Sequence, residues 1–551
     1  MIRAVARRFS KQVEVRLGKP AYRPPMIVWI PAIMIGLGMI LPVVYLLVRS
    51  FGVTSEGWHV LVELRTLYTL GRTVLLAITV MFGSLAIALP IAWLTVRTDL
   101  PMRRLWSVVT VLPLVIPSYV GAFLFISALG PKGLMQEWLP SFLGVERLPD
   151  IYGLAGATFT LVLLSYPYLL LTIRGAWSNL DPSTEESARS LGHGALGTIF
   201  RVTLPQLHPA IASGLVLVTL YTISDFGAVS LMRYQTFTWV IFQHYESSFD
   251  YSIAAVLSLV LILVAIVILA LEGITRNGLR YYRTGLGVQR MPTVVNLGRW
   301  RWPAVALCAV VVGLSLLLPM LVLGIWLFKG VLSGEPLLIL WAATRNSIMA
   351  SGMAAAVAAV LAIPLGILTV RYPGKFSLFL ERISFTGYAL PGVVVALALV
   401  FFGANYVPII YQTIWLLVFA YVVLFFPAAF GATRASLHQV SPSLEEAARG
   451  LGMNTRQVIS GITVPLVRSG VLMGAVLVFL IAMKELPATL ILSPLGFETL
   501  ATAVWSASSE AFFARAAAPA LTLILISSLP MAYLVSLEKK PVGLNTQGYH
   551  G

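Results

Sequence analysis

Long apolar segments recur along the whole chain, and they constrain its fold more than any other feature. A helix needs about 20 mainly apolar residues to cross the roughly 30 Å hydrocarbon core of a bilayer. Twelve segments meet this requirement, near residues 26–49, 72–96, 106–129, 152–173, 209–230, 252–273, 303–328, 346–370, 383–402, 413–433, 469–492 and 516–537. Only 11% of the residues are charged and the mean hydropathy is +0.89, which excludes a chain of soluble domains. We therefore predict an all-α polytopic membrane protein with twelve transmembrane helices.

The distribution of charge predicts how these helices are oriented. If the N-terminus is cytoplasmic, 28 of the 38 Lys and Arg residues lie in cytoplasmic segments, together with 8 of the 22 acidic residues. Basic residues gather in cytoplasmic loops of membrane proteins. The cytoplasmic segments then carry a formal charge of +20 and the rest of the chain −4. The net +16 is thus explained by membrane orientation with both termini cytoplasmic, and we expect the lipid bilayer, and no nucleic acid, as a partner.

An internal repeat divides the chain into two halves. The segment DPSTEESARSLG at 181–192 matches SPSLEEAARGLG at 441–452. Farther upstream the triplet Thr-Val-Arg at 95–97 recurs at 369–371. Six spans in each half give both repeats the same orientation, so the halves should be parallel. The predicted organisation is a cytoplasmic tail (1–25), a first six-span repeat (26–273), a basic cytoplasmic linker (274–302), a second six-span repeat (303–538) and a cytoplasmic C-terminal tail (539–551).

Each copy of the repeated segment predicts a short helix outside the membrane. A potential cap, Asp181 or Ser441, is followed by proline and then by acidic residues in the first turn. A capping box that begins two residues later is an alternative register. Ala188, Leu191 and Ala195 fall at positions i, i+3 and i+7 and should share a small apolar face, which could dock into a groove.

The same segments resemble the cytoplasmic loop of permease subunits of binding-protein-dependent ABC importers. The family pattern E-x-A-x-x-x-G runs from Glu186 to Gly192 and again from Glu446 to Gly452, and the first copy departs from it mildly with Ser187 in place of Ala. The resemblance implies the type I importer fold, in which this loop is a coupling helix seated on a separate ATPase. It implies ATPase-coupling roles for Glu185, Glu186, Ala188, Gly192, Glu445, Glu446, Ala448 and Gly452.

The partners and location follow from that resemblance. It implies a homodimeric ATPase on the cytoplasmic side, which holds ATP and magnesium, a periplasmic or extracellular solute-binding protein, and a bacterial plasma membrane. The chain itself lacks a P-loop, because Gly18-Lys19 is followed by Pro20 and Gly374-Lys375 by Phe376. It also lacks an H-E-x-x-H zinc motif and has a single cysteine. We therefore expect no catalytic residues and no cofactor in this chain.

Two carboxylates near the ends of the fifth spans predict the transport pathway. Asp225 and Glu485 are repeat equivalents, and helix breakers, Gly227 and Pro487, follow them. Ionisable groups inside spans usually face the bundle interior or a water-filled cavity, and carboxylate oxygens suit hard cations. We predict a pathway or gate at these four residues, with transient metal binding by the two acids. In the alternative interpretation each acid only caps the backbone after its helix, or Glu485 pairs with Lys484.

The segments around these acids (224–230, 234–238, 483–490 and 496–500) resemble those of fused permeases for ferric iron. Iron(III) is therefore the favoured substrate. Thiamine or another small solute is the alternative within the same family. A secondary transporter driven by an ion gradient is the rival class, and a channel or lipid-handling scaffold is a third possibility.

Overall fold

The fold is helical and membrane-spanning, as expected. The computed structural model describes residues 24–51, 58–136, 149–178, 180, 182–192, 194–247, 252–276, 294–334 and 338–538. Within these ranges, ten helices are long and apolar enough to cross a membrane. Two further pairs of helices, each joined at a sharp bend, raise the number to twelve if each pair is one span.

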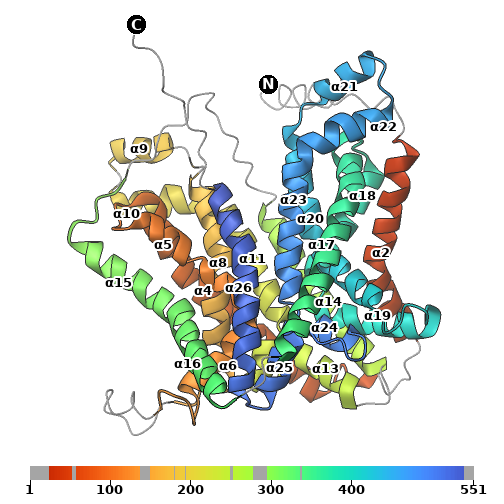
Figure 1. Cartoon of the computed structure of the whole chain (residues 1–551). Coiled ribbons are helices and arrows are strands. Elements are labelled where there is room, and N and C mark those ends of the chain that lie inside the picture. Colours follow the sequence, from red (N-terminus) through yellow and green to blue (C-terminus); the bar gives the residue numbers. More distant parts are fainter. Residues whose placement is uncertain are drawn as a thin grey trace. The chain divides into compact units, whose positions relative to one another are not determined.

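Both halves contain long helices and short connecting ones (Figure 1). The first half consists of α2 (Met26–Ser50), α4 (Leu64–Arg97), α5 (Arg103–Val109), η1 (Leu112–Val115), α6 (Ser118–Leu129), α8 (Leu154–Ser178), α9 (Pro182–Ser190), α10 (Ala195–Thr198), η2 (Ile199–Thr203), α11 (Leu204–Ser224), α12 (Gly227–Leu231), α13 (Phe237–Ser247) and α14 (Ser252–Arg276). The second half consists of η3 (Gly298–Trp300), α15 (Arg301–Val312), η4 (Gly313–Leu317), α16 (Leu318–Leu332), α17 (Leu338–Arg371), α18 (Lys375–Ser384), η5 (Thr386–Ala389), α19 (Gly392–Tyr406), α20 (Ile414–Gln439), α21 (Pro442–Gly450), α22 (Thr455–Val458), η6 (Ile459–Thr463), α23 (Val464–Met483), α24 (Pro487–Leu492), α25 (Leu500–Ser509) and α26 (Phe513–Glu538).

The third predicted span of each half was wrong as a single helix. The segment 106–129 contains α5 and α6, and the chain bends by 95° between η1 and α6. The segment 383–402 is likewise divided between the end of α18, η5 and α19. Pro117 and Pro391 directly precede the second helix of each pair. Proline has no N–H to donate and its ring clashes with the preceding turn, which favours a break at these two positions. The long helices α4 and α17 nevertheless continue through Pro90 and Pro364.

The fifth spans end earlier than predicted. The expected ranges 209–230 and 469–492 correspond to α11, which ends at Ser224, and α23, which ends at Met483. The helices that follow are the short α12 and α24, beginning at Gly227 and Pro487. The predicted break of both helices within a turn of the carboxylate is therefore confirmed.

The chain forms two compact units, and each combines residues from both halves. The first unit comprises residues 1–42, 351–388 and 421–482. In it the first span of the first half, α2, packs on α18 of the second half (Figure 1). The Trp29 and Phe376 rings lie 6.1 Å apart. A Cβ atom on Gly36 would lie 2.5 Å from Leu380 Cδ2, so the absence of a side chain at this glycine permits the close approach of the two helices.

The second unit comprises residues 43–350, 389–420 and 483–551. Its centre is formed by α4, α8 and α11, which pack on one another. The first span of the second half, α15 to α16, belongs to this unit, and α16 packs against α6 of the first half. The Phe513 ring at the start of α26 lies between them, 5.5 Å from Trp326 and 6.1 Å from Phe123. In each unit, therefore, the first span of one half lies against a helix of the other.

Candidate functional site

Both repeated segments form the short helices that the sequence predicts. In the second copy Ser441 is the N-cap of α21 and accepts a hydrogen bond from the Ser443 N–H, while Pro442 occupies the first turn. This confirms the proline-led register for α21. In the first copy α9 begins at Pro182. Asp181, the predicted cap of this helix, lies outside the described residues.

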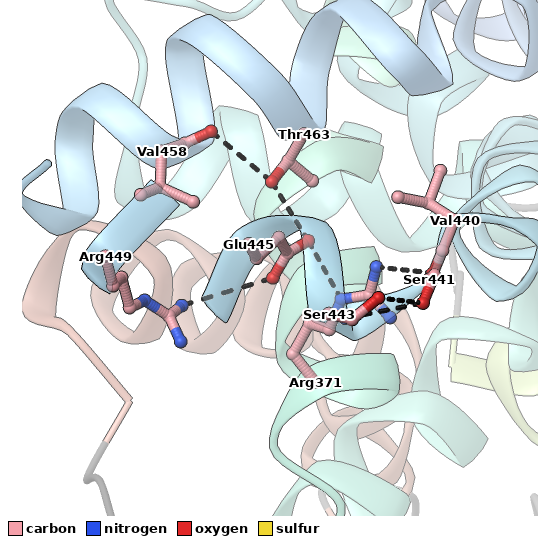
Figure 2. Close-up of polar contacts among 8 residues, drawn as sticks. All are labelled: Arg371, Val440, Ser441, Ser443, Glu445, Arg449, Val458 and Thr463. Atoms are coloured by element: carbon pink, nitrogen blue, oxygen red, sulfur yellow. Dashed lines mark hydrogen bonds and ion pairs between the residues drawn. The ribbon is translucent and has the colours of Figure 1, made fainter. Parts of the chain in front are cut away.

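A buried carboxylate holds α21 against the ends of two longer elements. Glu445 is 5% exposed. Its Oε1 accepts hydrogen bonds from Arg371 Nε, at the end of α17, and from Thr463 Oγ1, at the end of η6, each at 3.0 Å. Arg371 also donates through Nη2 to the Val440 carbonyl at 2.9 Å. Figure 2 shows Arg371 and Thr463 approaching Glu445 from opposite sides, with Arg449 near its other oxygen.

The first half repeats the three residues at the centre of this arrangement. Arg97 Nη2 lies 2.5 Å from Glu185 Oε1, and Thr203 Oγ1 donates to the same oxygen at 3.0 Å. We call Arg97, Glu185 and Thr203 the first clamp. Their repeat equivalents, Arg371, Glu445 and Thr463, form the second clamp. Each clamp fixes one of the short repeated helices, α9 or α21, to the end of the second long helix of its half and to the segment that leads into the fifth.

The two adjacent acids of each loop thus lie in different environments. Glu185 and Glu445 are bonded in the clamps, whereas Glu186 and Glu446 are exposed. Of the predicted ATPase-coupling residues, Ala188 and Ala448 are also buried, at 6% and 4% exposed. The buried members attach the helix to the protein, and the exposed acids are available to another surface.

Glycine ends both helices, and the turn exposes a leucine. Gly192 and Gly452 both have φ of +87°, a left-handed conformation that L side chains rarely adopt. In the second copy the Gly452 N–H bonds to the Arg449 carbonyl and the Met453 N–H to the Ala448 carbonyl, the two bonds of a Schellman motif.

The same turn corrects one expectation. Leu191 was predicted to share an apolar face with Ala188, but it is 82% exposed while Ala188 is buried. The helix ends at Ser190, so the helical spacing no longer applies at Leu191. Its repeat equivalent Leu451 is 87% exposed. Each loop therefore has an exposed leucine at its turn and an exposed glutamate on the preceding helix.

The partners of the clamp acids Glu185 and Glu445 were not predicted from the sequence. The triplets that end in Arg97 and Arg371 were predicted only as repeats, and Thr203 and Thr463 received no predicted role. The available signal was that the arginine, the threonine and the glutamate all recur at matched positions of the two halves. Hydrophobic periodicity does not reveal such pairs.

The predicted pathway acids are helix caps in the second unit. Asp225 Oδ1 accepts from the Ala228 and Val229 N–H groups at 3.0 and 3.3 Å, at the start of α12. Glu485 Oε1 accepts from the Ala488 N–H at 3.1 Å, at the start of α24. The alternative interpretation of capping is thus observed for both acids. Among the described residues, no group of three His, Cys, Asp or Glu side chains is placed to hold a metal ion.

The neighbours of the two acids differ in a compensating way. A Cβ atom on Gly392 would lie 2.3 Å from Glu485 Oε1. The repeat equivalent of Gly392 is Ser118, which hydrogen-bonds to Asp225. The longer acid is thus matched with glycine and the shorter acid with serine. Lys484 donates to the Leu114 carbonyl at 2.9 Å, so the alternative pairing of Lys484 with Glu485 is not seen among the described ion pairs.

Both halves of the chain match known membrane-transport proteins. The family model described as "Binding-protein-dependent transport system inner membrane component" matches residues 84–281 and 358–541, once in each half. The chain is 34% identical over 517 residues to the Fe(3+)-transport system permease protein FbpB 2 of Haemophilus influenzae, which covers 93% of this chain and 98% of that protein. It is 24% identical to the ferric transport system permease protein FbpB of Actinobacillus pleuropneumoniae, over 70% of this chain and 59% of that one.

Two further matches are partial. The molybdenum transport system permease protein ModB of Escherichia coli is 32% identical over 161 residues, 28% of this chain and 69% of that one. A solved structure of a bacterial alginate ABC transporter, in complex with an alginate-bound periplasmic protein, is 19% identical over 43% of this chain and 90% of that chain, with a TM-score of 0.35. A likeness of this size supports no argument about function.

The second clamp predicts unequal effects of substituting its two neighbouring acids. Glu445→Ala should leave Arg371 buried without its carboxylate and destabilise the protein by about 3 kcal/mol, because removing one partner exposes the full desolvation cost of the other. The matched control Glu446→Ala removes an exposed acid and should change stability by less than about 0.5 kcal/mol. Thermal unfolding in detergent, followed by the loss of monodisperse protein, measures both. Equal stability of the two variants would contradict the clamp.

The left-handed glycine predicts a second contrast. Gly452→Ala should destabilise the end of α21 by about 1–2 kcal/mol, because φ is positive there, although nothing lies within 4 Å of the new Cβ. Gly450→Ala is the control, since it is also unobstructed but lies within the helix, where alanine is favoured by about 1 kcal/mol. Amide hydrogen exchange across 442–458 compares the two. Faster exchange in both variants, or in neither, is incompatible with a conformational role for Gly452.

The pairing of Gly392 with Glu485 in one half and of Ser118 with Asp225 in the other predicts that a second substitution can restore stability lost by a first. Gly392→Ser should push the Glu485 carboxylate away from the Ala488 N–H and destabilise the protein by about 1–3 kcal/mol. Adding Glu485→Asp recreates the serine and aspartate combination of the first half and should restore most of that loss. Thermal unfolding of the single and double variants tests this, and additive destabilisation would show that the two positions are not coupled.

Proposed function

The chain belongs to the family of inner membrane components of binding-protein-dependent transport systems, and we propose that it forms the path by which iron(III) crosses the membrane in an ATP-driven importer. As a permease subunit it is a multi-pass inner membrane protein and not an enzyme. The substrate proposal depends on one observation, the 34% identity to an Fe(3+)-transport permease over nearly the full length of both chains. Thiamine or another small solute is the alternative substrate. An ion-gradient-driven mechanism is no longer favoured, because both halves match the importer family.

Energy reaches this chain from a partner in the proposed mechanism. A homodimeric ATPase, which carries ATP and magnesium, grips the helices α9 and α21 on the cytoplasmic side. The exposed pairs Glu186 with Leu191 and Glu446 with Leu451 offer the ATPase a charged and an apolar contact at each helix. Closure of the ATPase dimer moves α9 and α21. The clamps pass this movement to the long helices α4 and α17, because a buried ion pair holds each loop helix to the end of one of them.

Solute enters from the opposite side of the membrane in this proposal. A solute-binding protein delivers it outside, and both termini of the permease are cytoplasmic, as the excess of Lys and Arg in those segments indicates. Asp225 and Glu485 make the pathway attractive to a cation through their charge. The same two carboxylates also cap α12 and α24, each through one oxygen, Oδ1 of Asp225 and Oε1 of Glu485. They would therefore both hold the helix ends and attract the cation.

Reconstitution of the permease with its ATPase and binding protein in lipid vesicles tests this function. We expect iron(III) uptake that requires ATP, continues in the presence of uncouplers, and exceeds uptake of molybdate, sulfate or thiamine by at least about tenfold. Uptake abolished by uncouplers would indicate a gradient-driven transporter. Preference for another of these solutes would replace iron(III) but keep the ATP-driven mechanism.

A double variant in the same vesicles separates the charge of the two acids from their caps. Asp225→Asn with Glu485→Gln keeps an oxygen that can accept from the Ala228 and Ala488 N–H groups but removes both negative charges. Iron uptake should fall while thermal stability stays near that of the parent. Unchanged uptake would end the proposed role of the two acids without affecting the importer assignment.

A further inference from the structure

The end of the linker between the halves is bonded to the loop that follows α4. Thr98 and Val295 form a parallel bridge, in which the Val295 N–H donates to the Arg97 carbonyl at 2.7 Å and the Asp99 N–H donates to the Val295 carbonyl at 3.2 Å. Thr98 is fully buried there. This backbone pairing holds residues that are about 200 positions apart in the chain.

The Asp99 side chain completes the attachment. Its Oδ1 accepts from the Leu297 N–H at 2.8 Å, and its Oδ2 pairs with the guanidinium of Arg301, the first residue of α15. The Leu297 N–H, joined by Arg301, holds the pKa of the Asp99 carboxyl below its ordinary value. Asp99 therefore stays ionised at physiological pH. We call Val295 to Arg301, bonded in this way, the strap.

The strap meets the chain directly beside the first clamp. Arg97 provides both the carbonyl that receives the Val295 N–H and the guanidinium that pairs with Glu185 of α9. The second clamp is secured differently, since Arg371 has the extra bond to the Val440 carbonyl. Among the described residues, no side-chain bond of Arg97 to a carbonyl is seen, and its Nη1 is buried without a hydrogen-bond partner.

The second half has no counterpart of the strap's acceptor. The repeat equivalent of Asp99 is Pro373, which has neither a carboxylate nor an N–H. The two clamps therefore differ in how the backbone behind their arginine is held. In the second half the Val440 carbonyl, just before α21, accepts a hydrogen bond from Arg371. In the first half Val295 of the linker bonds to the backbone of Arg97 and Asp99, on either side of Thr98.

We infer that Asp99 is a positioning residue, which fastens the linker strap to the α4 end and so holds the first clamp in register for coupling to the ATPase. The inference rests on the proposed ATP-driven function. The linker between the halves would then position the first clamp as well as connect the two repeats. It also makes coupling asymmetric, because within the part of the chain that the structure describes the strap is bonded beside the first loop alone.

Hydrogen exchange of the full chain in lipid nanodiscs tests whether the strap exists. Asp99→Ala should speed exchange at the Leu297 amide by at least about fivefold, because the amide loses its acceptor. Asp99→Asn keeps an acceptor oxygen and should have a smaller effect. Arg299→Gln is the matched control: it removes a positive charge from the strap, but Arg299 is exposed and no side-chain bond of it is described. Equal exchange in Asp99→Ala and the parent would overturn the strap.

Transport in reconstituted vesicles then tests its role, with iron(III) loaded on the binding protein. Asp99→Ala should lower the iron imported per ATP hydrolysed by about two- to fivefold, while Arg299→Gln should match the parent. High salt should lower the ratio in the parent and less so in Arg301→Gln, since the Asp99 pair is partly exposed. A parental ratio in Asp99→Ala, with its strap loosened, would overturn the positioning role. A parent chain that imports no iron with ATP would refute the proposed function and leave the exchange result standing.

Discussion

Hydrocarbon offers no hydrogen bonds to a polypeptide, and this constraint governs how the spans of this protein can be broken. An unpaired backbone group in lipid costs several kcal/mol, so each interruption of a helix needs its own partners. After α11 and α23 the partners of the next helix are supplied by the carboxylates of Asp225 and Glu485. Before α6 and α19 a proline stands at the break and has no N–H to satisfy. Acids and prolines at equivalent positions thus allow both halves to depart from straight helices.

The clamps solve a different problem, which is how to join a short polar helix firmly to a transmembrane one. A nine-residue helix has little stability of its own. Burial of an arginine beside a glutamate fixes its position, because either charge alone would be costly in that environment. The threonine adds a second donor to the same oxygen and ties in the segment that follows. The exposed leucine and glutamate of each loop therefore belong to a segment whose position is fixed by the clamp.

Much of this architecture could be predicted from the amino-acid sequence, and the exceptions have physical reasons. Apolar length located the spans and the repeat located α9 and α21, since both signals are local. The break at Pro117 was missed because hydropathy continues through it, while the break at Asp225 was recognised from its charge and the following Gly227. The contact of Arg97 with Glu185 spans 88 positions and depends on tertiary packing. A repeat can indicate that such residues matter, but it cannot indicate which residues they touch.

The first span of each half packs against a helix of the other half, and this has a consequence for biosynthesis. The α2 helix leaves the ribosome well before its partner, because Gly36 packs on Leu380, which is made 344 residues later. At about 5–20 residues per second, α2 waits roughly 20 to 70 s for that partner. During this interval its glycine-containing face is open to lipid or to other membrane proteins. The packing of α2 is therefore completed only when the second half has been made, and a truncated first half would leave α2 without its native contact.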